Sequence, residues 1–348
     1  MPWRKISSAL PAGDHYFSGS EAIAEGAIAA GCNYFAGYPI TPTTETLERI
    51  STRFGETGAA FMQMEDEIAS ISSCIGASWA GAKALTVTSG PGFSLMQEGI
   101  GYAIMTETPV VIVNAQRAGP STGQIFVGGG DIMQARWGNH GGIPAIALSP
   151  WSVQELYDQT INAFNLAERY RVPVLIMAEA TTAHLRERMN VTGEVSVFDR
   201  DKKPGTAPFG TAEDDGVPPM PAFGEGEKLL VTGSTHDAYG VRKTSDPVTQ
   251  AKLTARLYNK IMNHREELDE YEGHYLEDAD VAVLCYGFTA RSSLFAADEL
   301  RKEGKKVGML RLKTLWPFAD TAVRDTGSRV KKILVPEMNL GQIVGEVV

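Results

Sequence analysis

Short apolar segments alternate with amphipathic ones through the first half of the chain. The apolar segments are typical of strands buried on both faces, and they cover residues 33–36, 59–62, 84–88, 109–115 and 173–177. Between them, apolar residues recur with the period of a helix, which predicts helices over residues 21–30, 65–79 and 153–170. One such stripe is Ile68, Ile71, Ile75 and Trp79. Repeated alternation of this kind predicts an α/β fold with a doubly wound parallel sheet.

The pattern changes after about residue 190. Residues 206–226 are rich in glycine, proline and acidic residues, which indicates an extended arm. One charged helix is predicted over 248–271, ending in a turn at 271–274. Alternation then resumes, with strands expected at 281–286, 306–310 and 331–335 and a tight corner at 315–317. We therefore expect a larger α/β domain over 1–190, an arm and helix over 191–274, and a smaller α/β domain over 275–348.

The composition is that of a soluble globular protein, with 43% hydrophobic and 21% charged residues in 348. A formal net charge of -10 without a basic patch argues against a nucleic-acid partner. No apolar run reaches the roughly 20 residues of a membrane span, and no secretory h-region is evident. The three cysteines, Cys32, Cys74 and Cys285, are widely spaced, so we expect buried thiols in a reducing cytoplasm rather than a disulfide framework or a bound cluster.

The stretch from Gly37 to Glu45 links a predicted strand to a predicted helix. Its Tyr38-Pro39-Ile40-Thr41 segment is followed by Pro42, and the two prolines stiffen the turn. Pro42 suits the first helical position and Thr41 the N-cap. Thr41 would then face outward at the carboxyl end of a strand, where open α/β sheets bind ligands. A plain capped helix would explain the same residues.

Three further groups follow predicted strands. Glu67 ends the acidic run Glu65-Asp66-Glu67, which suits a helix start, but it leads into the apolar stripe and is expected to point inward, where the pKa of a carboxyl rises. Ser89-Gly90-Pro91-Gly92 allows close backbone approach and presents N–H groups, although these residues are also typical of a turn. Arg117 is a candidate carboxylate clamp or a salt-bridge residue. Because the carboxyl ends of parallel strands share one edge, we expect these groups and Thr41 to meet in one crevice.

A long loop rich in glycine and polar residues follows, from Gly119 to Gly142. Long ordered loops are usually functional, and this one carries Arg136 and His140, either of which is a candidate to meet a second anionic group of a substrate. His140 has no neighbouring His or Cys at ligand spacing, so no metal site is expected here.

These motifs together resemble a known family, the α subunit of 2-oxoacid:ferredoxin oxidoreductases, and most closely its 2-oxoglutarate branch. The segments that carry the resemblance are Gly37-Tyr-Pro-Ile-Thr-Pro-Thr-Thr-Glu45, Gln63-Met-Glu-Asp-Glu-Ile-Ala-Ser70, Thr88-Ser-Gly-Pro-Gly-Phe-Ser-Leu-Met-Gln-Glu98, Arg117-Ala-Gly-Pro-Ser-Thr-Gly123, Asp131-Ile-Met-Gln-Ala-Arg-Trp-Gly138 and Pro336-Glu-Met-Asn-Leu-Gly-Gln342.

The resemblance implies thiamine diphosphate chemistry. A 2-oxoacid, 2-oxoglutarate in this branch, is decarboxylated and oxidised to an acyl-CoA while ferredoxin is reduced, or the reverse carboxylation takes place. By the same resemblance, Glu67 matches the carboxylate that bonds the aminopyrimidine ring, and Thr41 and Arg117 match residues that hold the substrate carboxylate. The remaining cofactor contacts are expected from Tyr38, Pro39, Ile40, Ser89, Gly90 and Pro91. The larger domain would be of the thiamine-diphosphate pyrimidine type, and the smaller one transketolase C-terminal-like.

Two features of such enzymes are missing from this chain. There is no Gly-Asp-Gly motif followed by Asn, which anchors Mg2+ and the diphosphate, and there are no cluster cysteines. The resemblance therefore implies a β subunit that holds Mg2+ and diphosphate, a [4Fe-4S] cluster in partner subunits, and γ or δ subunits besides. CoA would be the co-substrate and ferredoxin the electron partner. We expect the chain to be inactive alone.

Three alternatives stay open. The loop Gln124-Ile-Phe-Val-Gly-Gly-Gly130 departs from the pattern of the 2-oxoglutarate branch, which leaves branched-chain or aromatic 2-oxoacids or pyruvate as substrates. A scaffold subunit without chemistry would not need Thr41, Glu67 and Arg117 together. A dehydrogenase component that passes acyl groups to lipoamide is disfavoured only by the resemblance itself.

Overall fold

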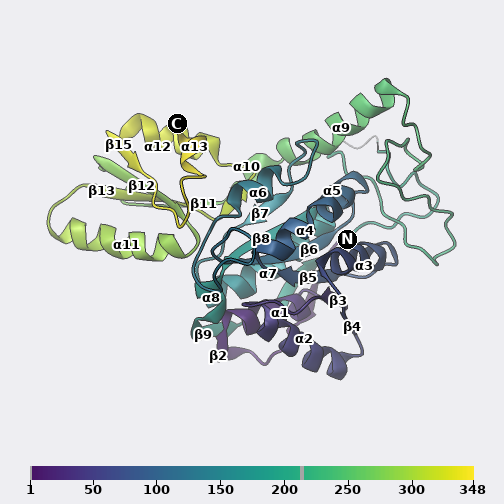
Figure 1. The fold of residues 1–348 in the computed structure, drawn as a ribbon, viewed down its shortest axis with the longest axis horizontal. Coiled ribbons are helices and arrows are strands. Elements are labelled where there is room, and N and C mark those ends of the chain that lie inside the picture. Colours follow the sequence, from purple (N-terminus) through teal and green to yellow (C-terminus); the bar gives the residue numbers. More distant parts are fainter. Residues whose placement is uncertain (1, 212–214) are drawn as a thin grey trace.

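The computed structural model describes residues 2–211 and 215–348. It contains two α/β units beside each other and a long irregular arm on the far side of the larger unit (Figure 1). No helix in these two ranges is long and apolar enough to cross a membrane.

The larger unit is built on a seven-stranded sheet. In spatial order, its strands are β14 (Thr314–Trp316), β7 (Ile146–Leu148), β8 (Pro173–Glu179), β6 (Val110–Gln116), β5 (Ala84–Thr88), β3 (Tyr34–Gly37) and β4 (Ala60–Gln63). All neighbours are parallel except β14, which runs antiparallel to β7. Every residue of β5, β6 and β8 is buried, as expected for strands covered on both faces. The predicted doubly wound parallel sheet is confirmed.

Helices cover both faces of this sheet (Figure 1). One face packs against α1 (Gly19–Ala29), α2 (Thr44–Thr57) and α7 (Val153–Tyr170). The other face packs against α3 (Glu67–Trp79), α4 (Gly90–Leu95), α5 (Gln97–Met105) and α6 (Ile132–Trp137). The apolar core on this second face includes Trp316 of β14 and continues into the smaller unit through Leu284 and Leu310, so the two units share one core.

The smaller unit has a four-stranded sheet. Its strands, in spatial order, are β11 (Tyr271–His274), β13 (Val307–Leu312), β12 (Val281–Tyr286) and β15 (Lys332–Leu334), and its helices are α11 (Gly287–Lys302), α12 (Asp320–Arg329) and α13 (Val344–Val347). Two predictions are wrong here. Residues 271–274 form the antiparallel edge strand β11 rather than a turn, and the expected corner at 315–317 includes part of β14. In both cases pairing with a distant strand, which local sequence does not reveal, decides the conformation.

The remaining elements lie between or beside these units. They are α8 (Ala180–His184), α9 (Pro247–Met262), α10 (Arg265–Leu268) and two antiparallel pairs, β1 (Trp3–Ser7) with β10 (Glu194–Phe198) and β2 (Gly13–Ser18) with β9 (Arg186–Val191). Neither pair was predicted, because the two strands of each pair are far apart in the chain. The single helix predicted over 248–271 is also wrong, since α9 ends at Met262.

The arm between β10 and α9 is held by buried charges. Its described residues, 199–211 and 215–246, contain no helix or strand. Arg171 donates to the carbonyl oxygens of Pro208, Pro218 and Pro219 at 2.6, 3.1 and 2.9 Å. The nearby Glu107 carboxylate is paired with Arg256 and Lys260 of α9. Burial acts to raise the pKa of Glu107, but these cations outweigh it and lower the pKa to about 2, so the carboxylate is charged.

Candidate functional site

The carboxyl ends of β3, β4, β5 and β6 lie along one edge of the larger sheet. The chain passes from β3 to β4 on one side and from β5 to β6 on the other, so the crevice between β3 and β5 is a topological switch point. Thr41 follows β3, Glu67 follows β4, Ser89 follows β5 and Arg117 follows β6. The structure brings these side chains to the same edge.

Arg117 joins two of these turns. The residue is 6% exposed, and its Nη1 donates to the backbone oxygen of Thr41 at 2.8 Å. Thr41 is exposed and is not the N-cap of α2, which begins at Thr44 after a turn in which Thr43 N donates to Ile40 O at 2.8 Å. The predicted helix start at Pro42 is therefore wrong. The Thr41 hydroxyl is not used as a cap.

Glu67 is the first residue of α3, and its side chain points inward. It is 4% exposed, while Asp66 is the N-cap and accepts from Ala69 N at 2.7 Å. Burial raises the pKa of Glu67, and Asp66 adds to this rise, whereas the positive charge of Arg117 opposes it. Glu67 therefore keeps its proton to a higher pH than an ordinary glutamate does.

The Glu67 carboxyl lies directly over the backbone of Gly92. A Cβ at Gly92 would be 2.2 Å from Glu67 Oε1 and 2.2 Å from Thr88 Oγ1, which is far inside van der Waals contact. The glycines of the Ser89–Gly92 turn were expected to let the backbone approach a ligand. At Gly92 the close approach is instead to the carboxyl of Glu67. Gly90 is open, with Arg117 Cγ as the nearest atom, 3.9 Å from a Cβ placed there.

Gly92→Ala is expected to lower the free energy of unfolding by about 1–3 kcal/mol, because the new methyl group must displace Glu67 or Thr88. Gly76→Ala is the matched control, since a Cβ at Gly76 in the middle of α3 meets nothing within 4 Å. That change should be neutral or stabilise by about 0.5–1 kcal/mol. Urea unfolding of the two variants measures the difference, and equal stabilities would contradict the packing described here.

Several buried polar atoms around this crevice have no partner in the described part of the chain. They are Thr88 Oγ1, Ser89 Oγ and Arg117 Nε. Buried polar groups are normally hydrogen-bonded, and leaving one unpaired costs about 1–3 kcal/mol. Other buried polar atoms in the fold are also unpaired, but these three stand at the ends of β5 and β6, on the edge that carries Glu67, and are therefore candidates to bond a polar ligand at the switch point.

Polar residues at the end of β6, which were not predicted as site residues, extend the site. Asn114 Nδ2 donates to Asp131 Oδ2 at 2.9 Å, and Asp131 N donates to Gln116 Oε1 at 3.2 Å. Burial raises the pKa of Asp131, although Asn114 and Arg117 oppose the rise. Asn114 and Gln116 interrupt an otherwise apolar strand, and that interruption was the available signal.

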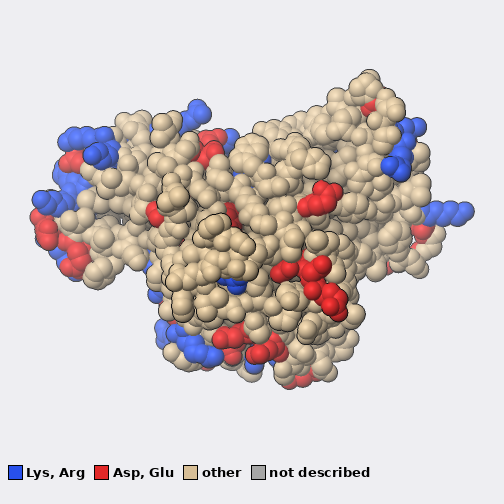
Figure 2. Space-filling view, viewed as in Figure 1, with Lys and Arg blue, Asp and Glu red and all other residues tan. Residues whose placement is uncertain are grey.

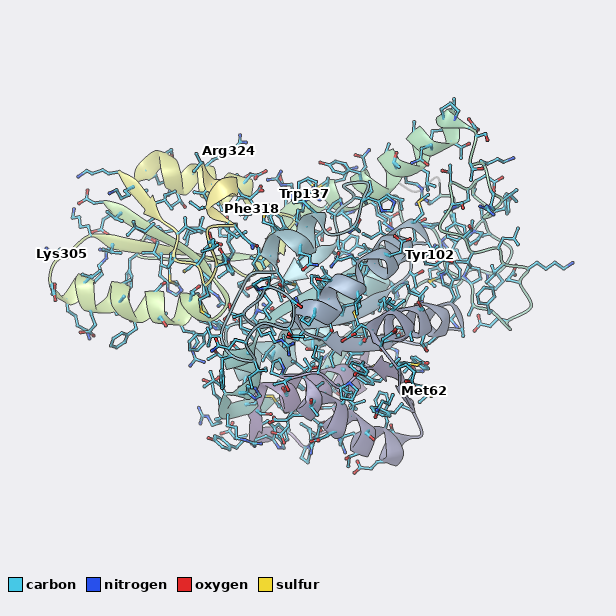
Figure 3. The ribbon with its side chains drawn as sticks, viewed as in Figure 1. Met62, Tyr102, Trp137, Lys305, Phe318 and Arg324 are labelled. Atoms are coloured by element: carbon cyan, nitrogen blue, oxygen red, sulfur yellow. The ribbon has the colours of Figure 1, made fainter. Side chains whose placement is uncertain are left out.

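Arg136 and His140 lie elsewhere. Arg136 donates to Gly142 O at 3.3 Å and lies 3.8 Å from the ring of Trp137, which is labelled in Figure 3. His140 lines a cavity of about 580 Å³ together with Tyr102 of α5, residues 232–235 of the arm and Leu257 of α9. No contact between described residues joins either side chain to Glu67, Thr41 or Arg117. A role for the two residues in substrate binding stays a prediction.

The rim of the crevice carries both apolar and polar residues. Tyr38 and Pro39 are exposed and Ile40 is half-buried, so the residues expected to line a cofactor lie at its rim. Figure 2 shows charged side chains of both signs at the far end of the smaller unit, and groups of acidic side chains on the larger unit near α3, α4 and α5. Within residues 2–211 and 215–348, no group of three or more His, Cys, Asp or Glu side chains is placed to hold a metal ion.

Comparison with known families gives two matches. The family described as "Pyruvate flavodoxin/ferredoxin oxidoreductase, thiamine diP-bdg" matches residues 25–256. The family described as "Pyruvate:ferredoxin oxidoreductase core domain II" matches residues 279–348. The first match includes every site residue discussed above.

Individual proteins are similar over nearly the whole chain. The 2-oxoglutarate synthase subunit KorA of Methanothermobacter thermautotrophicus is 48% identical over 339 residues, covering 96% of this chain and 90% of that protein. The ketoisovalerate oxidoreductase subunit VorB of Methanothermobacter marburgensis is 36% identical over 328 residues, covering 93% and 86%. A solved structure, 2-oxoglutarate:ferredoxin oxidoreductase from Magnetococcus marinus with 2-oxoglutarate, coenzyme A and succinyl-CoA bound, has a TM-score of 0.89 and 32% identity. The match covers 97% of this chain and 59% of that chain.

Proposed function

Because the chain belongs to the pyruvate flavodoxin/ferredoxin oxidoreductase family, we propose that it is the α subunit of a 2-oxoglutarate:ferredoxin oxidoreductase. The reaction is the thiamine-diphosphate-dependent oxidative decarboxylation of 2-oxoglutarate to succinyl-CoA with reduction of ferredoxin, or the reverse carboxylation. The observation that carries this proposal is the buried Glu67 carboxyl beside three unpaired polar atoms. The choice of 2-oxoglutarate is supported by the greater identity to subunit KorA, 48%, than to subunit VorB, 36%.

The residues present fit the aminopyrimidine ring of thiamine diphosphate. A flat polar ring needs a buried crevice with hydrogen-bonding groups, and Thr88, Ser89 and Glu67 provide them. When bound, thiamine diphosphate supplies the electron sink for the loss of CO2. Glu67 would share a proton with a ring nitrogen, and its raised pKa suits a group that must both hold and release that proton. Tyr38, Pro39, Ile40, Gly90 and Pro91 would line the ring.

Arg117 would hold the carboxylate of the 2-oxoacid. Its Nη1 is bonded to Thr41 O, which fixes the orientation of the guanidinium plane, while its Nε has no partner. A guanidinium in this state can form charge-assisted bonds to a carboxylate with little further ordering. The exposed Thr41 hydroxyl is a second donor at the same rim. A scaffold subunit without chemistry would gain nothing from keeping Arg117 buried and partly unpaired.

A partner β subunit would complete the site by holding Mg2+ and the diphosphate. The [4Fe-4S] cluster would lie in partner subunits, because Cys32, Cys74 and Cys285 of this chain are all buried and burial raises the pKa of each thiol. CoA would be the co-substrate and ferredoxin the electron partner, and γ or δ subunits would complete the assembly.

Exposed apolar side chains around the crevice support a partner at this edge. Tyr38, Met62, Ile68 and Leu95 are between 39% and 50% exposed, and Figure 3 labels Met62 of the edge strand β4. The prediction that Ile68 belongs to the inner stripe of α3 is wrong, because it faces outward. Large apolar side chains grouped on one face favour a protein interface.

We also propose a cytoplasmic location, since the three cysteines are free and a reducing compartment keeps them so. We propose the same domain boundaries as those expected from the sequence, near residues 190 and 275. The strands β9 and β10 lie across the first boundary and pack on the larger unit.

The substrate is tested with the chain purified together with its partner subunits, using CoA and a viologen dye as electron acceptor. We expect kcat/KM for 2-oxoglutarate to exceed that for 3-methyl-2-oxobutanoate and for pyruvate by at least about tenfold, the discrimination available when a site pairs a second carboxylate. The chain without its partners should show no turnover. Preference for another 2-oxoacid would contradict only the assignment of 2-oxoglutarate as substrate. Transfer of the acyl group to lipoamide, without reduction of the dye, would contradict the proposed reaction.

A further inference from the structure

Residues 336–342 run along the seam between the smaller unit and the carboxyl edge of the larger sheet. In Figure 1 this is the yellow segment that leaves β15 and returns to α13. The segment forms no helix or strand, yet its three polar side chains, Glu337, Asn339 and Gln342, are all hydrogen-bonded, both toward a glycine loop of the larger unit and within the smaller unit.

The first set of bonds holds the glycine loop at Gly129 and Gly130. Asn339 Nδ2 donates to Gly129 O at 2.8 Å, and Gly129 N donates to Met338 O at 3.0 Å. Gln342 Nε2 donates to Gly130 O at 2.6 Å, while its Oε1 accepts from Met133 N at 2.9 Å. The backbone oxygens of Gly129 and Gly130 and the N–H of Gly129 are therefore bonded to residues about 210 positions away in the sequence.

The second set of contacts runs from that loop to the turn that carries Arg117. Gln124 N donates to Ala118 O at 2.8 Å, and Ala118 N donates to Phe126 O at 3.3 Å. A Cβ at Gly128 would be 2.5 Å from Ala118 N and 2.8 Å from Arg117 C, so the two backbones touch. The loop therefore packs against the backbone at Arg117 and Ala118, and a shift of the loop is expected to move the turn that carries the arginine.

The third set of bonds fastens the segment to the smaller unit. Glu337 Oε2 accepts from the Tyr286 hydroxyl at the end of β12 at 2.7 Å, from Ile343 N at 2.9 Å and from Asn339 Nδ2 at 3.1 Å. Burial acts to raise the pKa of Glu337, but the bonds from Ile343 and Tyr286 outweigh it and the pKa is lowered. Glu337 is therefore a carboxylate, and it orients the Asn339 amide toward the loop.

We propose that residues 337–342 are a clamp through which the smaller unit positions Arg117, with Asn339 and Gln342 as its positioning residues. This inference rests on the proposed function in one respect: the proposed function assigns Arg117 to bind the substrate carboxylate. Neither Asn339 nor Gln342 contacts Arg117 directly. They act through the glycine loop, which has no side chains at positions 128–130 and is therefore held through its backbone. The bonds from Asn339 and Gln342 hold it on the side of the smaller unit, and Gly128 packs against Ala118 on the side of Arg117.

The test uses the complex with its partner subunits and the variant Gln342→Ala, which removes both bonds of a half-buried side chain. The KM for 2-oxoglutarate is expected to rise about tenfold with little change in kcat. Amide hydrogen exchange of residues 124–131 should speed up by a similar factor. Asn339→Asp, which places a second carboxylate beside Glu337, should act in the same direction more strongly.

The control is Asn190→Asp, which also removes an amide donor beside a carboxylate, in the exposed pair of Asn190 with Asp14. It should leave KM and exchange unchanged. A double-mutant cycle with Arg117→Lys separates an effect on the position of Arg117 from general structural damage. If Gln342 acts through Arg117, then Gln342→Ala should change KM less than twofold once Arg117 is replaced.

Unchanged exchange in Gln342→Ala, or an equal tenfold effect in the Arg117→Lys background, would overturn the clamp. If the wild-type complex uses no 2-oxoacid, the proposed function is wrong. The hydrogen exchange of residues 124–131 in Gln342→Ala then tests the clamp without any activity measurement.

Discussion

Glu67→Gln is expected to lower kcat of the assembled enzyme by about 10²–10⁴-fold, the range that proton transfer by a positioned side chain contributes. Glutamine has nearly the same shape and can still fill the space over Gly92 and Thr88. It cannot take up or release a proton. Because the carboxyl is 4% exposed, water has little access to replace it. The loss should therefore fall on the chemical step and leave the binding of thiamine diphosphate nearly intact.

The measurement is turnover of 2-oxoglutarate with CoA and a viologen dye, together with the amount of thiamine diphosphate that copurifies. Glu65→Gln is the matched control, since Glu65 belongs to the same acidic run but is exposed. It should retain wild-type activity. Full activity in Glu67→Gln would remove the central residue from the mechanism, and equal losses in both variants would point to a general effect of charge at this helix end.

Arg117→Lys is expected to lower kcat/KM for 2-oxoglutarate by about 10²–10³-fold, as for truncation of a buried charged pair. Lysine keeps the positive charge but not the planar fork, so it cannot bond Thr41 O and a carboxylate at once. The single ammonium group of lysine also cannot reach all the polar groups that the guanidinium of Arg117 can reach. The effect should be seen for every 2-oxoacid, because all share the carboxylate that Arg117 would bind.

Steady-state kinetics with two or more 2-oxoacids measures this effect. Arg188→Lys is the control, because the side chain of Arg188 is 80% exposed and has one ion pair, with Asp14 at 3.3 Å. It should behave as wild type. If Arg117→Lys changes kcat/KM for 2-oxoglutarate alone, Arg117 binds the distal end of the substrate and not the shared carboxylate.

Much of both units could be predicted from the sequence. The helix predicted over 153–170 has the bounds of α7, and the strands predicted over 84–88 and 281–286 have those of β5 and β12. These elements have a strong hydrophobic period or a continuous apolar run, and both signals are local. The order of elements then led to the parallel sheet and to one edge where Thr41, Glu67, Ser89 and Arg117 gather.

Predictions failed where pairing or packing between distant segments decides. Trp3 pairs with Phe198 and Gly13 with Val191, and β14 joins the sheet of the larger unit although it follows strands of the smaller one. The N-cap assigned to Thr41 was also wrong, because the backbone oxygen of Thr41 is bonded to Arg117, 76 positions later.

The sequence by itself determined which residues stand at the ends of the strands, because hydrophobic period and turn residues act over a few positions. Only the tertiary structure decided that Glu67 lies over Gly92, that three polar atoms beside it stay unpaired, and that residues 337–342 hold the loop behind Arg117. These relations depend on distances between segments far apart in the chain, and such distances are determined by how whole helices and sheets pack.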